Sequence, residues 1–129
     1  MNIPVVYVQA PPKPDEKMFY INILEALNAP HRVTDKSLQL YKQVTHVLRK
    51  VQNKVLIIDE IHHILAGSYV NQRAFLNVIK YLANDLQIVI IGSGVRDALS
   101  AINRINNWRT VLSRQYCRDG KWVRNTCDC

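Results

Sequence analysis

The sequence predicts an α/β domain with a mostly parallel sheet covered by helices. Three short runs of branched apolar residues alternate with longer segments of helical periodicity along a chain of 129 residues. The apolar runs are continuous rather than alternating, as expected when helices cover both faces of a parallel sheet. The resulting order of elements, β-α-α-β-α-β-α, is typical of layered α/β folds.

The first predicted strand covers residues 5–10 (VVYVQA) and stops at the PPKP segment. Asp15 then offers an N-cap for a helix. The apolar residues of this helix recur at four-residue spacing: Phe19, Ile23 and Leu27. Asn28 and Pro30 are typical of a helix end and terminate it.

A second helix is predicted from Asp35, and Asn53 closes it. Its apolar face consists of Leu40, Val44, Val47, Leu48 and Val51. The second strand follows directly over residues 54–60 (KVLIIDE).

A third helix is predicted over about residues 70–85. Its inward face consists of Phe75, Val78, Ile79 and Leu82. The third strand covers residues 87–94 (QIVIIGSG) and ends in a glycine-containing turn. Residues 95–102 (VRDALSAI) begin a further helix.

Each predicted strand ends in a polar residue: Gln9 in the first, Asp59 and Glu60 in the second, and Ser93 in the third. The carboxyl ends of parallel strands share one edge of a sheet, and ligands bind at that edge. We therefore expect these four side chains to converge.

Four apolar residues followed by Asp59 and Glu60 form a Walker B signature, which is typical of metal-assisted phosphoryl transfer. Asp59 would hold Mg²⁺ through water, because Mg²⁺ prefers oxygen ligands and keeps part of its hydration shell. Glu60 would polarise the water that attacks the γ-phosphate of ATP. Ser93 would sense that phosphate, and Gln9 would hold Glu60 away from the water until a partner binds.

Two other interpretations of this segment stay open. The acids could simply end a strand or favour the start of the next helix, with one of His62 and His63 packing or capping locally. The stretch DEIH from Asp59 also matches the DExH box of helicases, although the other helicase motifs do not occur in the chain.

Composition excludes several classes of protein. The apolar runs are far shorter than the ~20 residues that a membrane span needs, and the N-terminus lacks signal-peptide features, so we expect a cytoplasmic location. Residues 103–129 carry 6 of the 17 Lys and Arg. This basic tail, with its Trp and Tyr residues, would either contact nucleic acid or remain a solvated, disordered end.

The three cysteines, Cys117, Cys127 and Cys129, all lie in that tail. An odd number without an export signal indicates free thiols. Their spacing does not match a zinc ribbon, and His62 and His63 would complete a four-ligand set only if distant segments met.

The blocks YVQAPPKPDEKMFYINILEALNAPHR, VLIIDEIHHILAGSYVNQRAFLNVIKYLANDLQIVIIG and GVRDALSAI resemble TniB-family proteins. These are AAA+ ATPases of transposons, related to the TnsC and IstB-type transposition helpers. The resemblance covers residues 3–102 and implies a P-loop NTPase core, a three-layer sandwich. It further implies that intact members bind ATP and Mg²⁺, assemble as homo-oligomers on DNA, and direct or activate a transposase. By motif position, Asp59 and Glu60 are the Walker B pair and Ser93 is the first sensor.

The chain departs from the family pattern in two places. A P-loop needs G-x-x-x-x-G-K-[ST], and the four glycines, Gly67, Gly92, Gly94 and Gly120, cannot form it. After Ile102 the resemblance to the family ends, and neither Arg104 nor Arg109 sits in a recognisable arginine-finger motif. The expected protein is therefore a partial copy with impaired nucleotide binding; a non-catalytic module that binds DNA or transposase and a helicase fragment are the alternatives.

Overall fold

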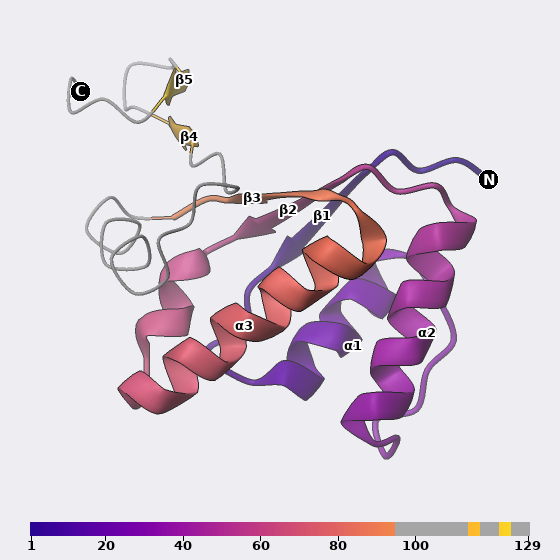
Figure 1. Ribbon diagram of the computed structural model, residues 1–129, viewed down its shortest axis with the longest axis horizontal. Helices are drawn as coiled ribbons and strands as arrows, with labels where there is room; N and C mark the ends of the chain where they lie inside the picture. The colour runs from indigo at the N-terminus through magenta and orange to yellow at the C-terminus, as the bar shows by residue number, and fades with distance from the viewer. Residues whose placement is uncertain (95–113, 117–121, 125–129) are drawn as a thin grey trace.

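The computed structural model describes residues 1–94 together with two three-residue strands at 114–116 and 122–124. Three parallel strands form the main sheet: β1 (Val5–Gln9), β2 (Val55–Asp59) and β3 (Val89–Gly92). Three α-helices pack beside it (Figure 1): α1 (Glu16–Ala26), α2 (Ser37–Lys50) and α3 (Tyr69–Leu86). The α/β class and the parallel sheet expected from the sequence are confirmed.

The strands of the main sheet lie side by side in chain order, β1-β2-β3. Val5 pairs with Val55 and Gln9 with Asp59, while Ile58 pairs with Gly92. This register brings the carboxyl ends of all three strands to one edge. Among the described residues, β1 and β3 form the two outer edges of the sheet.

Helix α1 begins where the sequence predicts. The side chain of Asp15 accepts a hydrogen bond of 3.1 Å from the amide of Met18, which satisfies one of the free N–H groups at the helix start. Phe19, Ile23 and Leu24 are fully buried.

Helix α2 begins later than predicted, at Ser37 instead of Asp35. Asp35 lies in the preceding turn, where its amide donates to the carbonyl of Arg32 at 3.1 Å. One face of α2 is buried, and an ion pair of 3.1 Å between Arg49 and Asp85 joins its C-terminal turn to α3.

Helix α3 is framed by two polar residues. The hydroxyl of Ser68 accepts from the amide of Asn71 at 3.3 Å, and Gln87 ends the helix in a left-handed conformation with φ 53°. The buried face of α3 carries Phe75, Leu76, Ile79 and Leu82. This helix covers the predicted range 70–85 with one further residue at each end.

The helices cover one face of the sheet. All three lie on the same side of it (Figure 1), and the residues of β1 alternate between exposed and buried. On the other face, Val5 and Tyr7 are 50% and 58% exposed. Residues 1–94 therefore provide a sheet and one helical layer, whereas helices were expected on both faces.

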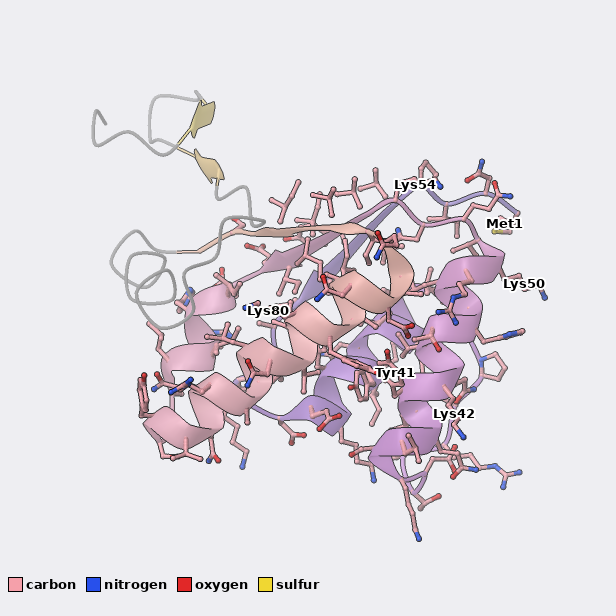
Figure 2. All side chains as sticks on the ribbon, in the orientation of Figure 1. Met1, Tyr41, Lys42, Lys50, Lys54 and Lys80 are labelled. Carbon is pink, nitrogen blue, oxygen red and sulfur yellow. The ribbon has the colours of Figure 1, made fainter. Side chains whose placement is uncertain are left out.

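Positively charged side chains lie on the surface of residues 1–94. Four lysines labelled in Figure 2 are exposed: Lys42, Lys50, Lys54 and Lys80. Within the described ranges, none of the helices combines the length and the hydropathy that crossing a membrane requires.

Strands β4 (Arg114–Tyr116) and β5 (Trp122–Arg124) pair antiparallel, with Tyr116 opposite Trp122. The sequence indicated no element in this segment. The helix predicted over 95–102 and the three cysteines lie outside the described residues.

Candidate functional site

The carboxyl edge of the sheet brings the four predicted site residues into one region. The amide of Ala10, directly after Gln9, donates to the carbonyl of Asp59 at 2.8 Å. On the other side, the amide of Ser93 donates to the carbonyl of Ile58 at 2.9 Å. The parallel sheet therefore produces the convergence of strand ends that the sequence predicted.

Asp59, at the end of β2, is held by two hydrogen bonds. Its Oδ1 accepts from the amide of Glu60 at 2.8 Å, and its Oδ2 accepts from the hydroxyl of Tyr7 on the neighbouring strand. The hydrogen bond to Asp59, followed by desolvation and the nearby negative charges, raises the pKa of Tyr7 above its usual value. Tyr7 therefore stays protonated and fixes the orientation of the carboxylate.

Glu60 leaves the strand in a strained conformation. Its φ of 55° and ψ of 36° are left-handed, a region that residues other than Gly seldom occupy. The second strand predicted from the sequence included Glu60, but the reversal of its backbone ends β2 at Asp59. A 3-10 helix, η1 (Ile61–Leu65), follows at once. Such strain concentrates at functional sites, where the surrounding structure holds it in place.

The carboxylate of Glu60 faces two histidines. Its Oε2 lies 3.1 Å from Nε2 of His62 and 3.9 Å from Nε2 of His63. The two imidazole rings contact each other edge to face, with centroids 4.6 Å apart. The Glu60 side chain is 42% exposed, so the cluster remains open to solvent.

Gln9 does not make the expected contact. Among the described residues, the imidazoles of His62 and His63 lie closest to the Glu60 carboxylate, and the side chain of Gln9 is not hydrogen-bonded to it. Gln9 is exposed, and its backbone carbonyl accepts from the amide group of Asn22 at 3.2 Å. The side chain beside Glu60 is therefore a histidine from the following turn.

Two glycines allow the end of β3 to approach η1. A Cβ atom at Gly92 would lie 2.7 Å from Cδ1 of Ile61, and one at Gly94 would lie 3.3 Å from Nδ1 of His62. Ile61 is 1% exposed and has little room to move. Its amide donates to the carbonyl of Ser93 at 2.9 Å, which connects the turn that carries Glu60 to the end of β3.

Comparison with known families accounts for most of the chain. A family model described as "Bacterial TniB protein" matches residues 1–112. The chain belongs to the TniB family. Membership associates it with transposition. The matched range runs past Ile102, where the resemblance noted from the sequence ends. A search of curated proteins found no match to the chain.

In this TniB-family chain, Tyr7 and the orientation of the two histidines are the site features that sequence reasoning missed. Tyr7 precedes Gln9 by two residues and therefore projects from the same face of β1. Its contact with Asp59 depends on the register between β1 and β2. The signal in the sequence was a tyrosine two residues before the polar end of the first strand, where its hydroxyl can reach the ends of neighbouring strands.

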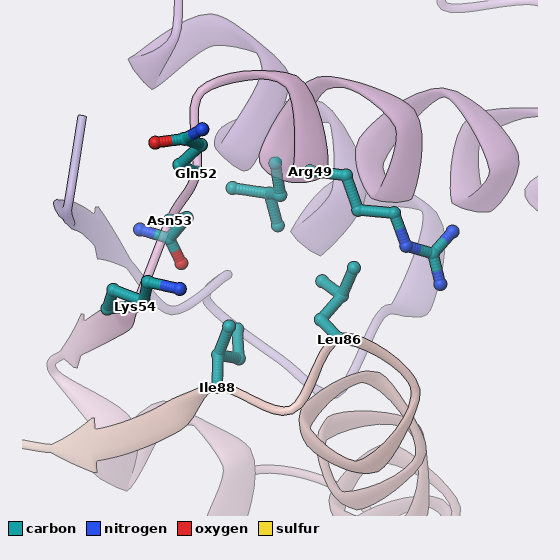
Figure 3. A pocket seen from close by; sticks show the side chains of 7 residues that line it. Arg49, Gln52, Asn53, Lys54, Leu86 and Ile88 are labelled. Carbon is teal, nitrogen blue, oxygen red and sulfur yellow. The ribbon is translucent and has the colours of Figure 1, made fainter. Parts of the chain in front are cut away.

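A cavity of about 340 Å³ lies at the opposite end of the sheet (Figure 3). Its lining includes Leu48 and Arg49 from α2 and the residues that precede β2 and β3, Lys54 and Ile88. Asn53, also in its wall, donates to the carbonyls of Pro4 and Val55 at 3.3 Å and 3.0 Å and so joins the starts of two strands. We assign this region a structural role.

Proposed function

We propose that this chain contributes part of an ATP site to a TniB-family regulator of transposition, which selects the target and activates the transposase. The observation that carries the proposal is the adjacent pair Asp59 and Glu60 at the carboxyl end of the middle strand. This edge of a parallel sheet is where ligands bind. The family match supports the association with transposition.

In this proposal each polar residue has a distinct role. Asp59 binds Mg²⁺ through water, and Glu60 activates the water that attacks the γ-phosphate. Ser93 senses the γ-phosphate from the end of β3, next to the turn that carries Glu60. Gln9 lies at the outer side of the same edge.

The donor set at Asp59 fits Mg²⁺, because carboxylate oxygens are its preferred protein ligands. Both oxygens are already hydrogen-bonded, one to the Tyr7 hydroxyl and one to the Glu60 amide. A water-bridged ion can share such oxygens, since each carboxylate oxygen accepts more than one hydrogen bond. Direct coordination would require the Tyr7 hydroxyl to move.

The present conformation of Glu60 corresponds to a resting state. Its Oε2 lies 3.1 Å from Nε2 of His62, and a positively charged imidazole at that distance makes a carboxylate a weaker base toward water. We assign to His62 the restraining role that was expected of Gln9. Binding of a partner that moves His62 would release Glu60.

The chain lacks the loop that normally holds the phosphates. None of its four glycines belongs to a G-x-x-x-x-G-K-[ST] motif. These residues therefore do not provide the backbone amides that bind the phosphates of ATP in a P-loop. We expect this polypeptide by itself to bind ATP weakly. The outer edge of β3 is unpaired in the described residues and favours self-association through strand pairing.

A titration with a fluorescent ATP analogue, with and without Mg²⁺, tests nucleotide binding, and size-exclusion chromatography measures assembly. We expect weak binding and concentration-dependent association. Tight, Mg²⁺-dependent binding by a monomer would contradict the expectation for the isolated chain.

A transposition assay tests the function itself. The chain is added to a transposase of the same element and target DNA, without ATP or with enough ATP to saturate a weak site, as wild type, Asp59→Asn or Glu60→Gln. Both variants should lose the ATP-dependent part of target selection, while Glu25→Gln, which changes an exposed carboxylate on α1, should behave as wild type. Target selection that is identical with and without ATP would refute an ATP-dependent role.

A second candidate is a non-catalytic module that binds DNA or transposase. The basic segment 103–129, with 6 of the 17 Lys and Arg, favours it. If Glu60→Gln leaves transposition unchanged while deletion of 103–129 abolishes DNA binding, this second function is the correct one.

A further inference from the structure

We propose that Glu60, His62 and His63 form a binding site for a transition-metal ion of the zinc class. Each residue offers one ligand atom, and the three atoms lie within 4.8 Å of one another. The set is distinct from the magnesium position proposed at Asp59, because it contains two imidazole nitrogens. Imidazole favours Zn²⁺, Ni²⁺ and Cu²⁺, whereas Mg²⁺ prefers oxygen.

The spacing of the ligand atoms is close to that of a bound ion. Tetrahedral Zn²⁺ with bonds of about 2.0–2.1 Å places its ligand atoms roughly 3.3–3.4 Å apart. Oε2 of Glu60 lies 3.1 Å from Nε2 of His62 and 3.9 Å from Nε2 of His63. A tetrahedral ion would require the first distance to lengthen slightly and the second to shorten by about half an ångström.

The backbone holds the three residues in a short, rigid turn. Ile61 and Ile64 are 1% and 0% exposed and anchor η1 in the core, so His62 and His63 are fixed between two buried side chains. The amide of His63 donates to the carbonyl of Glu60 at 3.0 Å, which closes the turn. A site built on fixed backbone loses little conformational entropy when an ion binds.

The second ring nitrogen of His63 has a suitable partner. Its Nδ1 lies 3.5 Å from the carbonyl oxygen of Ala10. A hydrogen bond from Nδ1 to a carbonyl selects the tautomer whose Nε2 carries the free lone pair, as is usual for metal-binding histidines. The Nε2 atom itself lies 3.9 Å from Oε2 of Glu60.

The site is open on one side. Exposed fractions of 28% for His62, 31% for His63 and 42% for Glu60 leave room for an ion to enter and for water as a fourth ligand. An ion bound there would occupy the Glu60 carboxylate and stop it from activating water. This inhibitory effect rests on the proposed function, whereas the binding itself does not.

Titration with Co²⁺, a spectroscopic substitute for Zn²⁺, tests the site without nucleotide. The full chain is used with Cys117, Cys127 and Cys129 changed to Ser, because thiolates are strong ligands for the same ions. We expect visible Co²⁺ absorption bands that saturate at one ion per chain and are displaced by Zn²⁺. If the serine variant does not fold, the wild-type chain with alkylated thiols replaces it.

Variants identify the ligands. His62→Ala, His63→Ala and Glu60→Gln should each weaken Co²⁺ binding by at least about tenfold, since even the loss of a residue that only orients a ligand reduces affinity about 10–100-fold. His46→Ala, which removes an exposed histidine from α2, is the matched control and should leave affinity unchanged. Circular dichroism confirms that each variant is folded. Absence of binding, or equal affinity in all four variants, would overturn the proposal.

Discussion

The hydroxyl of Tyr7 on β1 donates a hydrogen bond to Oδ2 of Asp59 on β2. This contact crosses between neighbouring parallel strands and is the main reason that the pKa of Tyr7 lies above its ordinary value of 10.0. It couples the ionisation of an exposed tyrosine to the carboxylate that we assign to Mg²⁺.

Asp59→Asn should therefore lower the pKa of Tyr7 toward its ordinary value, because the charged acceptor is lost. Glu60→Gln is the matched control, since Glu60 contributes the smallest of the effects that raise this pKa. NMR titration of labelled tyrosine, without added metal and with Tyr7→Phe to assign the signal, measures the pKa. An equal shift in both variants would contradict a direct bond to Asp59.

Two tyrosines on the helices, Tyr20 and Tyr41, should make the stability of the fold depend on pH in the alkaline range. Burial, together with hydrogen bonds to Glu16 at 2.8 Å and Asp85 at 2.6 Å, raises the pKa of Tyr20 and of Tyr41. A raised folded-state pKa stabilises the fold fully below the ordinary value of 10.0, and this stabilisation is lost as pH rises through the raised pKa.

The free energy of unfolding should consequently fall above about pH 10. Tyr20→Phe and Tyr41→Phe should make that fall shallower, and each should remove about 0.5–1.5 kcal/mol at neutral pH through the lost hydrogen bond. Urea unfolding at a series of pH values measures both effects. Tyr69→Phe, at an exposed position in the first turn of α3, is the control. A fall of the same slope in the Tyr20 and Tyr41 variants as in the wild type would refute the assignment.

Helix α3 depends on its buried face. Ile79 is fully buried, so Ile79→Ala should lower the free energy of unfolding by roughly 2–5 kcal/mol. Val70→Ala, at a side chain that is 73% exposed on the same helix, should change it by less than about 0.5 kcal/mol. Chemical denaturation compares the two, and similar losses would show that α3 is not packed as described.

Gly92 and Ile61 should behave as a coupled pair. A Cβ at Gly92 would meet Cδ1 of Ile61 at 2.7 Å, so Gly92→Ala should destabilise the fold by about 1–3 kcal/mol through overpacking. Ile61→Val removes Cδ1 and should restore much of that loss when the two changes are combined. A double-mutant cycle from urea unfolding measures the coupling, and additive losses would exclude the steric explanation.

Much of the scaffold follows from local sequence. The apolar runs identify all three strands of the main sheet, and Asp15 marks the start of α1, because these signals need no tertiary context. Asp35 is not the start of α2, because it still belongs to the preceding turn, in which its amide donates to Arg32, and Lys36 takes the N-cap position. The 3-10 helix after Glu60 was missed because a five-residue turn has no repeat from which periodicity can be recognised.

The candidate site was predictable in position but not in detail. The convergence of Gln9, Asp59 and Ser93 follows from parallel strands alone. Which side chain faces Glu60 depends on its left-handed backbone, which directs the carboxylate toward His62. Local sequence patterns do not encode that reversal, since residues other than Gly rarely adopt it.

The order β1-β2-β3 has a consequence for how the side of the sheet that no described helix covers can be filled. Connections between parallel strands are almost always right-handed. When each new strand is added on the same side of the previous one, as in β1, β2 and β3, all the connecting helices therefore lie on one face of the sheet. A further parallel strand beside β3 whose connection leads back to β1 would cross the sheet in the opposite direction. A right-handed connection in that direction would cover the face that carries Val5 and Tyr7. The same segment would then pair the edge of β3 and bury this face.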